Sequence, residues 1–144
     1  MIAAADTSFL VSLYGGDVHT PGARAWMAAN ATPVLFSDAL RFETENALRL
    51  ACFRGRITIA ELQAALSEIE SDLATGILIA RDIPAAAHWS ECCRLSGTHT
   101  LSLGCRAFDI THVAASVIMG ADTFLSFDQK QRTLAFQAGL MVGP

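Results

Sequence analysis

The sequence predicts an α/β fold in which one parallel sheet is covered by helices on both faces. Short apolar runs of strand character alternate with longer stretches of helical periodicity along the whole chain. The strand-like runs are continuously apolar, as in strands that are buried on both sides. Because parallel strands need long connections, the helical stretches between the runs are the expected crossovers.

The chain opens with an expected strand over residues 2–5 and a helix over 7–14. Gly15 and Gly16 are expected to stop this helix, because glycine readily adopts the left-handed conformation that ends helices. A second helix is expected over 20–29. A proline lies in its first turn, where the missing N–H would have had no partner.

The next strand, over residues 33–36, leads into a long helix over 39–53. Either Ser37 or Asp38 can cap this helix, because both side chains can accept a hydrogen bond from a free N–H of the first turn. Gly55 closes it.

A helix over residues 59–74 is expected to begin at a capping box formed by Thr58 and Glu61. The run over 76–80 is apolar and is expected to form the third strand. A helix over 84–96 follows it.

The helix over residues 106–119 is apolar nearly all round and is therefore expected to be buried. A strand over 122–127 and a helix over 129–137, ending near Gly139, come next. A last strand is expected over 140–142.

The 144 residues are expected to form one domain, 1–144, because no linker, repeat or low-complexity tract divides them. Hydrophobic residues make up 52% of the chain and the mean hydropathy is +0.38. A domain this apolar is expected to expose part of that surface to a second copy or to a standing partner. No apolar stretch is long enough for a membrane span and Asp6 interrupts any signal peptide, so a cytoplasmic protein is expected.

The formal net charge of −4 argues against the broad basic face of a sequence-reading DNA-binding protein. It does not argue against chemistry on nucleic acids at a metal site, because divalent ions would offset the charge of clustered carboxylates. The four cysteines lack the spacing of a zinc site or a disulfide framework and are expected to be reduced thiols.

Four acidic residues lie where the side chains of such a fold can converge. Asp6 and Asp128 each follow a predicted strand, and ligands bind at the carboxyl ends of parallel strands. Glu43 and Asp109 interrupt largely apolar helices. Clustered carboxylates repel one another and are stable as ions only when a cation shares the site, and hard oxygen ligands select Mg²⁺ or Mn²⁺. The pattern is typical of a metal-dependent phosphodiesterase.

Simpler interpretations exist for three of these carboxylates. Asp6 and Asp128 can each cap the helix that follows. Glu43 can form a surface ion pair with Arg41 or Arg49 on its own helix. Capping and metal binding are compatible, since one carboxylate oxygen can serve each purpose.

Asp109 is the most informative position, because its helix has little polar surface and burying a lone carboxylate costs several kcal/mol. Arg106, one turn earlier, is a possible partner. His112 shares the face of Asp109 and is expected as a supporting or core histidine rather than a metal ligand. Asn46 is expected beside Glu43 on one edge of their helix.

Four segments together resemble the signatures of the PIN domain, and within it most closely the VapC-type toxins of toxin–antitoxin pairs. They are Asp6-Thr7-Ser8, residues 42–48 (FETENAL), residues 106–115 (RAFDITHVAA) and residues 124–131 (FLSFDQKQ). The resemblance covers almost the whole chain in the same order. Ser126 departs from it, since the family usually has threonine there, but the hydroxyl is kept.

The resemblance implies a three-layer α/β/α fold with a parallel sheet of about five strands, and a metal-dependent endoribonuclease that uses Mg²⁺ or Mn²⁺. The implied catalytic and metal-binding residues are Asp6, Glu43, Asp109 and Asp128. Supporting or substrate-positioning roles are expected for Thr7, Asn46, Arg106, His112 and Ser126. RNA is the implied substrate, and an antitoxin encoded beside the toxin is the implied partner.

The antitoxin is expected to lay an amphipathic segment into the groove between the helices over 39–53 and 59–74. These helices carry more apolar residues than one face of the sheet can cover. The residues expected on this surface are Leu48, Phe53, Leu62, Leu66 and Ile69. A homodimer would compete for the same surface.

Two other functions stay open. The first is a PIN-type nuclease for RNA maturation or decay outside any toxin–antitoxin system, which the absence of a neighbouring antitoxin gene would favour. The second is a catalytically silent module that uses an acidic pocket to bind a basic peptide, and titration with manganese would separate it from an enzyme.

Overall fold

The computed structural model describes residues 1–144 and contains one five-stranded sheet with the strand order β3-β2-β1-β4-β5. Every neighbouring pair of strands is parallel. The strands are β1 (Ala3–Ala5), β2 (Val34–Phe36), β3 (Leu78–Ala80), β4 (Thr123–Leu125) and β5 (Met141–Gly143). The expected parallel sheet is thus confirmed, with β1 at its centre.

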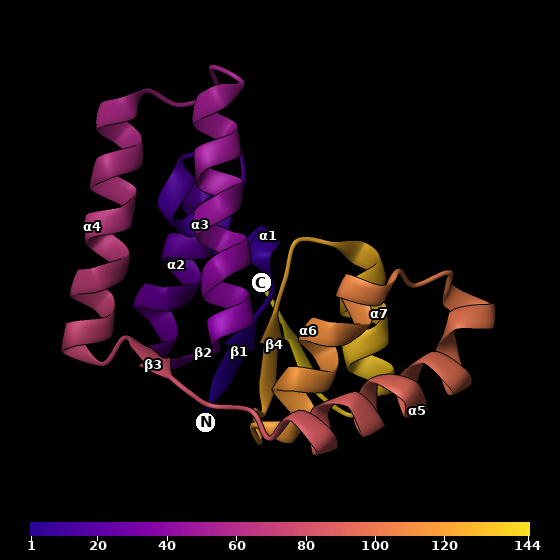
Figure 1. The fold of residues 1–144 in the computed structure, drawn as a ribbon. Coiled ribbons are helices and arrows are strands. Elements are labelled where there is room, and N and C mark those ends of the chain that lie inside the picture. The colour runs from indigo at the N-terminus through magenta and orange to yellow at the C-terminus, as the bar shows by residue number, and fades with distance from the viewer.

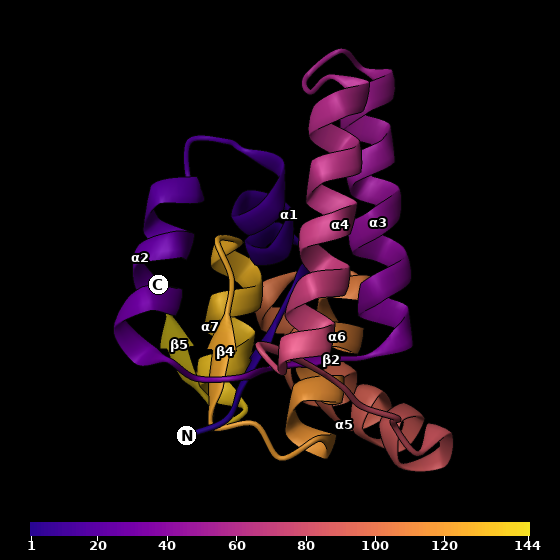
Figure 2. The ribbon, with the colours of Figure 1, turned by 90° about the vertical axis from the view of Figure 1, so that its left-hand side faces the viewer.

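Seven helices cover the sheet in two layers. They are α1 (Thr7–Gly15), α2 (Thr20–Asn30), α3 (Asp38–Phe53), α4 (Ile59–Thr75), α5 (Ala85–Leu103), α6 (Ala107–Ile118) and α7 (Gln129–Gln137). Helices α1–α4 lie on one side of the strands and α5–α7 on the other (Figure 1). The α3–α4 hairpin extends well beyond the sheet (Figure 2). None of these helices combines the length and the apolar character that a bilayer span requires.

The alternation of side chains along the strands explains the two layers. Ala3 and Ala5 belong to a core of 15 buried residues shared with α1–α4, whereas Ala4 faces the opposite side. A second core of nine buried residues joins Phe124 of β4 to α5, α6 and α7. Because both faces of each central strand are covered, the strands can be apolar throughout.

The helices begin where the sequence places capping residues. Asp6 and Asp128 accept hydrogen bonds from the third residue of α1 and α7, respectively. Ser37 rather than Asp38 caps α3, and Thr58 caps α4. These side chains satisfy backbone N–H groups that would otherwise have no partner in the helix.

One expectation about the second layer was wrong. Helix α5 continues to Leu103 and not only to residue 96, and it ends at Gly104, whose φ is 64°. Leu95, fully buried near the middle of α5, packs this helix onto the second core. Helix α6 is largely buried, as expected, but Phe108 in its first turn is 67% exposed.

The predicted partner surface needs a larger correction. Leu48 and Ile69 are fully buried, because the inner faces of α3 and α4 cover the core above the sheet. Leu62 and Leu66 are partly buried against that same core. Of the five expected surface residues, Phe53 alone is freely accessible, with 88% of its surface exposed.

Candidate active site

The four predicted carboxylates line one cavity of about 350 Å³ beyond the carboxyl ends of β1 and β4. Asp6 directly follows β1, Asp128 follows β4, Glu43 comes from α3, and Asp109 from the first turn of α6. Strands β1 and β4 are neighbours at the centre of the sheet. The complete lining consists of Asp6, Ser8, Glu43, Arg106, Ala107, Phe108, Asp109, Asp128 and Gln131.

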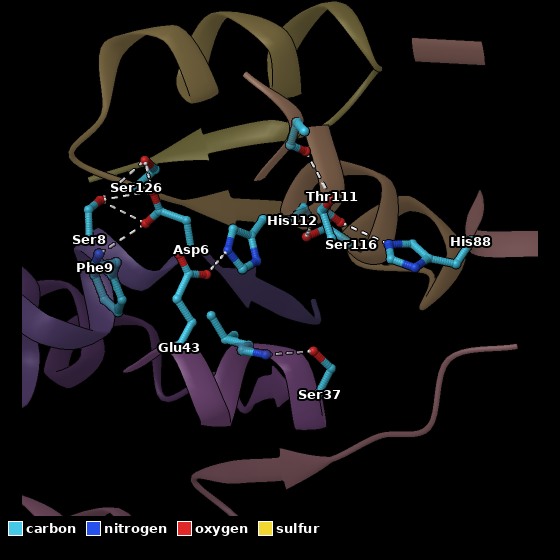
Figure 3. A network of polar contacts seen from close by, with 12 residues as sticks. Asp6, Ser8, Phe9, Ser37, Glu43, His88, Thr111, His112, Ser116 and Ser126 are labelled. Atoms are coloured by element: carbon cyan, nitrogen blue, oxygen red, sulfur yellow. Dashed lines mark hydrogen bonds and ion pairs between the residues drawn. The ribbon is translucent and has the colours of Figure 1, made fainter. Parts of the chain in front are cut away.

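Asp6 is fully buried and held by three donor groups (Figure 3). Ser8 Oγ lies 2.8 and 2.9 Å from its two carboxylate oxygens, Ser126 Oγ donates at 2.7 Å, and the Phe9 N–H donates at 3.0 Å. Burial raises the pKa of Asp6, and these hydrogen bonds oppose that rise only in part. The carboxylate is thus fixed in direction by uncharged donors alone.

Glu43 is hydrogen-bonded by the imidazole of His112, which is buried on α6 (Figure 3). This hydrogen bond is the main reason that the pKa of Glu43 is lowered, with burial acting in the opposite direction. Because a carboxylate can only accept, His112 donates through Nε2 and is positioned to hold Glu43 ionised toward the cavity.

The surface ion pair that was the simpler interpretation of Glu43 is formed by Glu45 instead. Arg41 Nε lies 2.9 Å from Glu45 Oε1 and Arg49 Nη2 lies 3.0 Å from Glu45 Oε2. Glu43 lines the cavity and accepts the hydrogen bond of His112.

Asp109 is buried and has one local partner. The backbone N–H of Arg106 donates to Asp109 Oδ2 at 3.0 Å, and the Arg106 guanidinium Nε lies 3.7 Å from the same oxygen. The Arg106 side chain is 83% exposed, so solvent screens this ion pair and its contribution is small. Oδ1 of Asp109 makes no hydrogen bond within the protein and is free to take a ligand.

Asp128 and Ser126 form a turn that ties the end of β4 to Asp6. The Asp128 N–H donates to Ser126 Oγ at 2.9 Å, and the Gln131 N–H donates to Asp128 Oδ1 at 2.9 Å. Ser8 Oγ in turn accepts the N–H of Phe127 at 3.0 Å. The two serine hydroxyls therefore couple the loops after β1 and β4.

Two of the expected supporting residues lie differently from the expectation. Asn46 is exposed and does not line the cavity, because three residues are less than a full helical turn and carry it from Glu43 toward solvent. The Thr7 hydroxyl is not at the rim. It is buried without a well-formed hydrogen bond, close enough to Glu43 to help lower the pKa of that carboxyl.

The structure adds four residues that sequence reasoning gave no role in the site. The residues that line the cavity without having been predicted are Ser8, Ala107, Phe108 and Gln131. The placement of Ser8 two residues after Asp6, where a short side chain can fold back onto that carboxylate, was an available signal. Nothing in the apolar pattern of residues 106–119 indicated which side of α6 meets the cavity.

The lining suits a hard divalent cation in the kind of ligands that it offers. Four carboxylates meet at one cavity that is lined by a single, exposed basic side chain, and the hydrogen-bond partners of the buried Asp6 are all uncharged. The buried hydroxyl of Thr7, which forms no well-formed hydrogen bond, helps to lower the pKa of Glu43. No three acidic, histidine or cysteine side chains are spaced closely enough in this structure to enclose an ion. The donor set therefore fits such a cation, although the carboxylates would have to move closer together to enclose it.

Comparisons with known proteins agree with this architecture. The family model of the PIN domain matches residues 3–137. The crystal structure of VapC20 from Mycobacterium tuberculosis, described as a sarcin-ricin loop cleaving toxin, is similar with a TM-score of 0.69 and 20% identity, and 99% of each chain is covered. PAE2754 from Pyrobaculum aerophilum is similar with a TM-score of 0.61 and 13% identity, over 99% of this chain and 89% of that one. No curated protein sequence matches the chain.

At these identities the solved structures establish the likeness of fold, whereas the family match spans nearly the whole chain. The predicted signatures around the four carboxylates lie within the matched residues. The chain therefore belongs to the PIN domain family.

Proposed function

We propose that this protein is a metal-dependent endoribonuclease and the toxin of a VapBC-type toxin–antitoxin pair. The observation that carries the proposal is the meeting of Asp6, Glu43, Asp109 and Asp128 at one cavity. PIN domains are generally nucleases, and the similar VapC20 is described as cleaving the sarcin-ricin loop, an RNA element. A cluster of carboxylates repels an anionic substrate such as RNA unless a bound cation offsets the negative charge.

The same four carboxylates are the residues that would hold Mg²⁺ or Mn²⁺. When bound, such an ion would supply positive charge to the scissile phosphate and lower the pKa of an attacking water molecule. The serine hydroxyls of Ser8 and Ser126 fix both oxygens of Asp6, and His112 fixes Glu43. Because these contacts already orient the two carboxylates, Asp6 and Glu43 would lose less conformational entropy when they bind a metal ion.

Arg106 contributes the one basic side chain of the cavity. Its guanidinium is largely exposed and only weakly paired with Asp109, so it is free to form two parallel hydrogen bonds with a phosphate group. It would hold the anionic backbone of RNA beside the carboxylates of the cavity.

The antitoxin surface is proposed on the outer part of the α3–α4 hairpin. Phe53 and Ile59, on either side of the turn between the helices, are 88% and 68% exposed. Leu62 and Leu66 continue this stripe but are partly covered by the core. An amphipathic helix laid along the stripe would bury apolar surface that this chain leaves in water.

Incubation of the purified protein with a pool of structured cellular RNAs, followed by mapping of new 5′ ends, tests the proposed activity. We expect new ends only with Mg²⁺ or Mn²⁺ present. Metal binding in calorimetry without any cleavage would favour a binding module, and neither binding nor cleavage would contradict the proposal. A small neighbouring gene whose product blocks cleavage would favour the toxin over an RNA-maturation nuclease.

A further inference from the structure

Phe108 is a large apolar side chain that stays in solvent at the mouth of an acidic cavity. It is 67% exposed and lines the cavity together with the four carboxylates. Among the nine lining residues only Phe108 and Ala107 are hydrophobic. Its neighbours on α6, Asp109 and Ile110, are buried, so the ring points outward because of its position on the helix. An exposed ring forgoes the favourable free energy of burial, and it is available to a ligand.

Arg106 lies two residues before Phe108 and lines the same cavity. Its side chain is 83% exposed, and its one ion pair, to Asp109, is long at 3.7 Å. A flat apolar ring and a largely exposed guanidinium thus lie two residues apart in the sequence, and both line the cavity that holds the carboxylates. These are the two groups that recognise the two chemical parts of a nucleotide, the base and the phosphate.

We propose that Phe108 stacks on an unpaired base next to the scissile phosphate while Arg106 contacts the adjoining phosphate. This inference rests on the proposed RNA-cleaving function and gives it a substrate class, namely RNA with an unpaired nucleotide at the cleaved bond. In an A-form duplex the faces of the bases are stacked on one another, so an aromatic side chain can reach only a base that is splayed out of a loop or a single strand.

The test uses the full chain and a single-stranded RNA that the wild-type protein cleaves in the presence of Mn²⁺. Two further RNAs carry an abasic nucleotide on one or the other side of the cleaved bond, and a fourth holds the same sequence in a duplex. The variants are Phe108→Ala, Phe108→Trp and, as the matched control, Phe136→Ala. Phe136 on α7 is also exposed, at 72%, but it does not line the cavity.

We expect Phe108→Ala to raise KM for the intact RNA roughly tenfold with little change in kcat, as the loss of one stacked base would. Phe108→Trp should restore KM, and Phe136→Ala should leave it unchanged. One of the abasic RNAs should raise KM for the wild-type protein by a similar factor, with no further rise for Phe108→Ala, because the two changes remove the same contact. The duplex should be a poor substrate for every variant.

Cleavage of the intact RNA by Phe108→Ala with the wild-type KM would overturn the inference and leave the proposed function standing. Losses that multiply when Phe108→Ala is combined with each of the two abasic RNAs would overturn it as well. So would a wild-type dimer that Phe108→Ala dissociates in size-exclusion chromatography, since the ring would then belong to an interface between copies. A wild-type protein that cleaves no RNA would overturn the proposed function and this inference with it.

Discussion

His112 and Glu43 are 69 residues apart in the sequence, yet their side chains form a hydrogen bond that joins α6 to α3 (Figure 3). The imidazole is buried, whereas the Glu43 side chain is 34% exposed. The buried imidazole of His112 is therefore a fixed hydrogen-bond donor, and it holds the more exposed carboxylate of Glu43 in one orientation. A residue that orients a metal-binding carboxylate affects metal affinity without itself touching the ion.

The first prediction follows from this contact. His112→Ala should raise the Mn²⁺ concentration needed for half-maximal RNA cleavage by about 10- to 100-fold, because Glu43 would no longer be held in place. The measurement is a manganese titration of cleavage. His88→Ala is the matched control, since His88 is also buried but contacts the backbone oxygen of Thr111, outside the cavity lining. Equal effects of the two substitutions would contradict the assigned role of His112.

Replacing Asp109 separates a metal-binding role from a structural one. Asp109→Asn should abolish metal-dependent RNA cleavage and leave the melting temperature of the metal-free protein unchanged or higher, because a neutral side chain relieves repulsion among the carboxylates. Asp122→Asn is the control, since Asp122 is exposed and lies outside the cavity lining. A marked drop in melting temperature for Asp109→Asn would instead assign Asp109 to a structural pair with Arg106.

The raised pKa of Asp6 predicts how stability depends on pH. In the window between the ordinary value of 3.8 and the raised native pKa, the folded protein binds more protons than the unfolded chain. Protonation of Asp6 therefore stabilises the folded, metal-free protein at low pH. The free energy of unfolding should decrease as the pH rises through that window and this stabilisation is lost. Denaturant unfolding at a series of pH values should show Asp6→Asn gaining stability relative to the wild type as the pH rises. A difference between the two proteins that does not vary with pH would contradict this assignment.

Charge substitutions on the α3–α4 hairpin test the proposed antitoxin surface. Ile59→Glu and Phe53→Asp should weaken binding of a purified cognate antitoxin by about 2 kcal/mol or more, as substitutions at the centre of an interface do. Cleavage of RNA by the free protein should be unchanged, because neither residue lines the cavity. The measurement is calorimetric titration, with Leu101→Glu on the distant helix α5 as the control. Unchanged affinity of both hairpin variants would place the antitoxin elsewhere.

The fold was predictable because its signals are local. Continuous apolar runs mark the strands, and capping residues such as Thr58 mark helix starts within a turn. The site was predictable in outline for a related reason: Asp6 and Asp128 end strands that were expected in one parallel sheet, whose carboxyl ends lie at a common edge.

What could not be predicted depends on packing between segments far apart in the sequence. The contact of His112 with Glu43 requires α6 and α3 to approach each other across the edge of the sheet, which no local pattern encodes. The exposure of Phe108 depends on which side of a nearly all-apolar helix meets the core. The burial of Leu48 and Ile69 depends on how closely the α3–α4 hairpin lies against the sheet.

Manganese-dependent cleavage of RNA by the wild-type protein and by four variants is the decisive test of the proposed metal site. The variants are Asp6→Asn, Glu43→Gln, Asp109→Asn and Asp128→Asn, each assayed at matched folded concentration with and without a chelator. We expect cleavage by the wild type that the chelator abolishes, and a loss of at least about 100-fold in each variant, on the order of 2.7 kcal/mol of transition-state stabilisation. Cleavage that persists in the chelator, or a variant that retains wild-type activity, would show that the four carboxylates do not act together through a divalent ion.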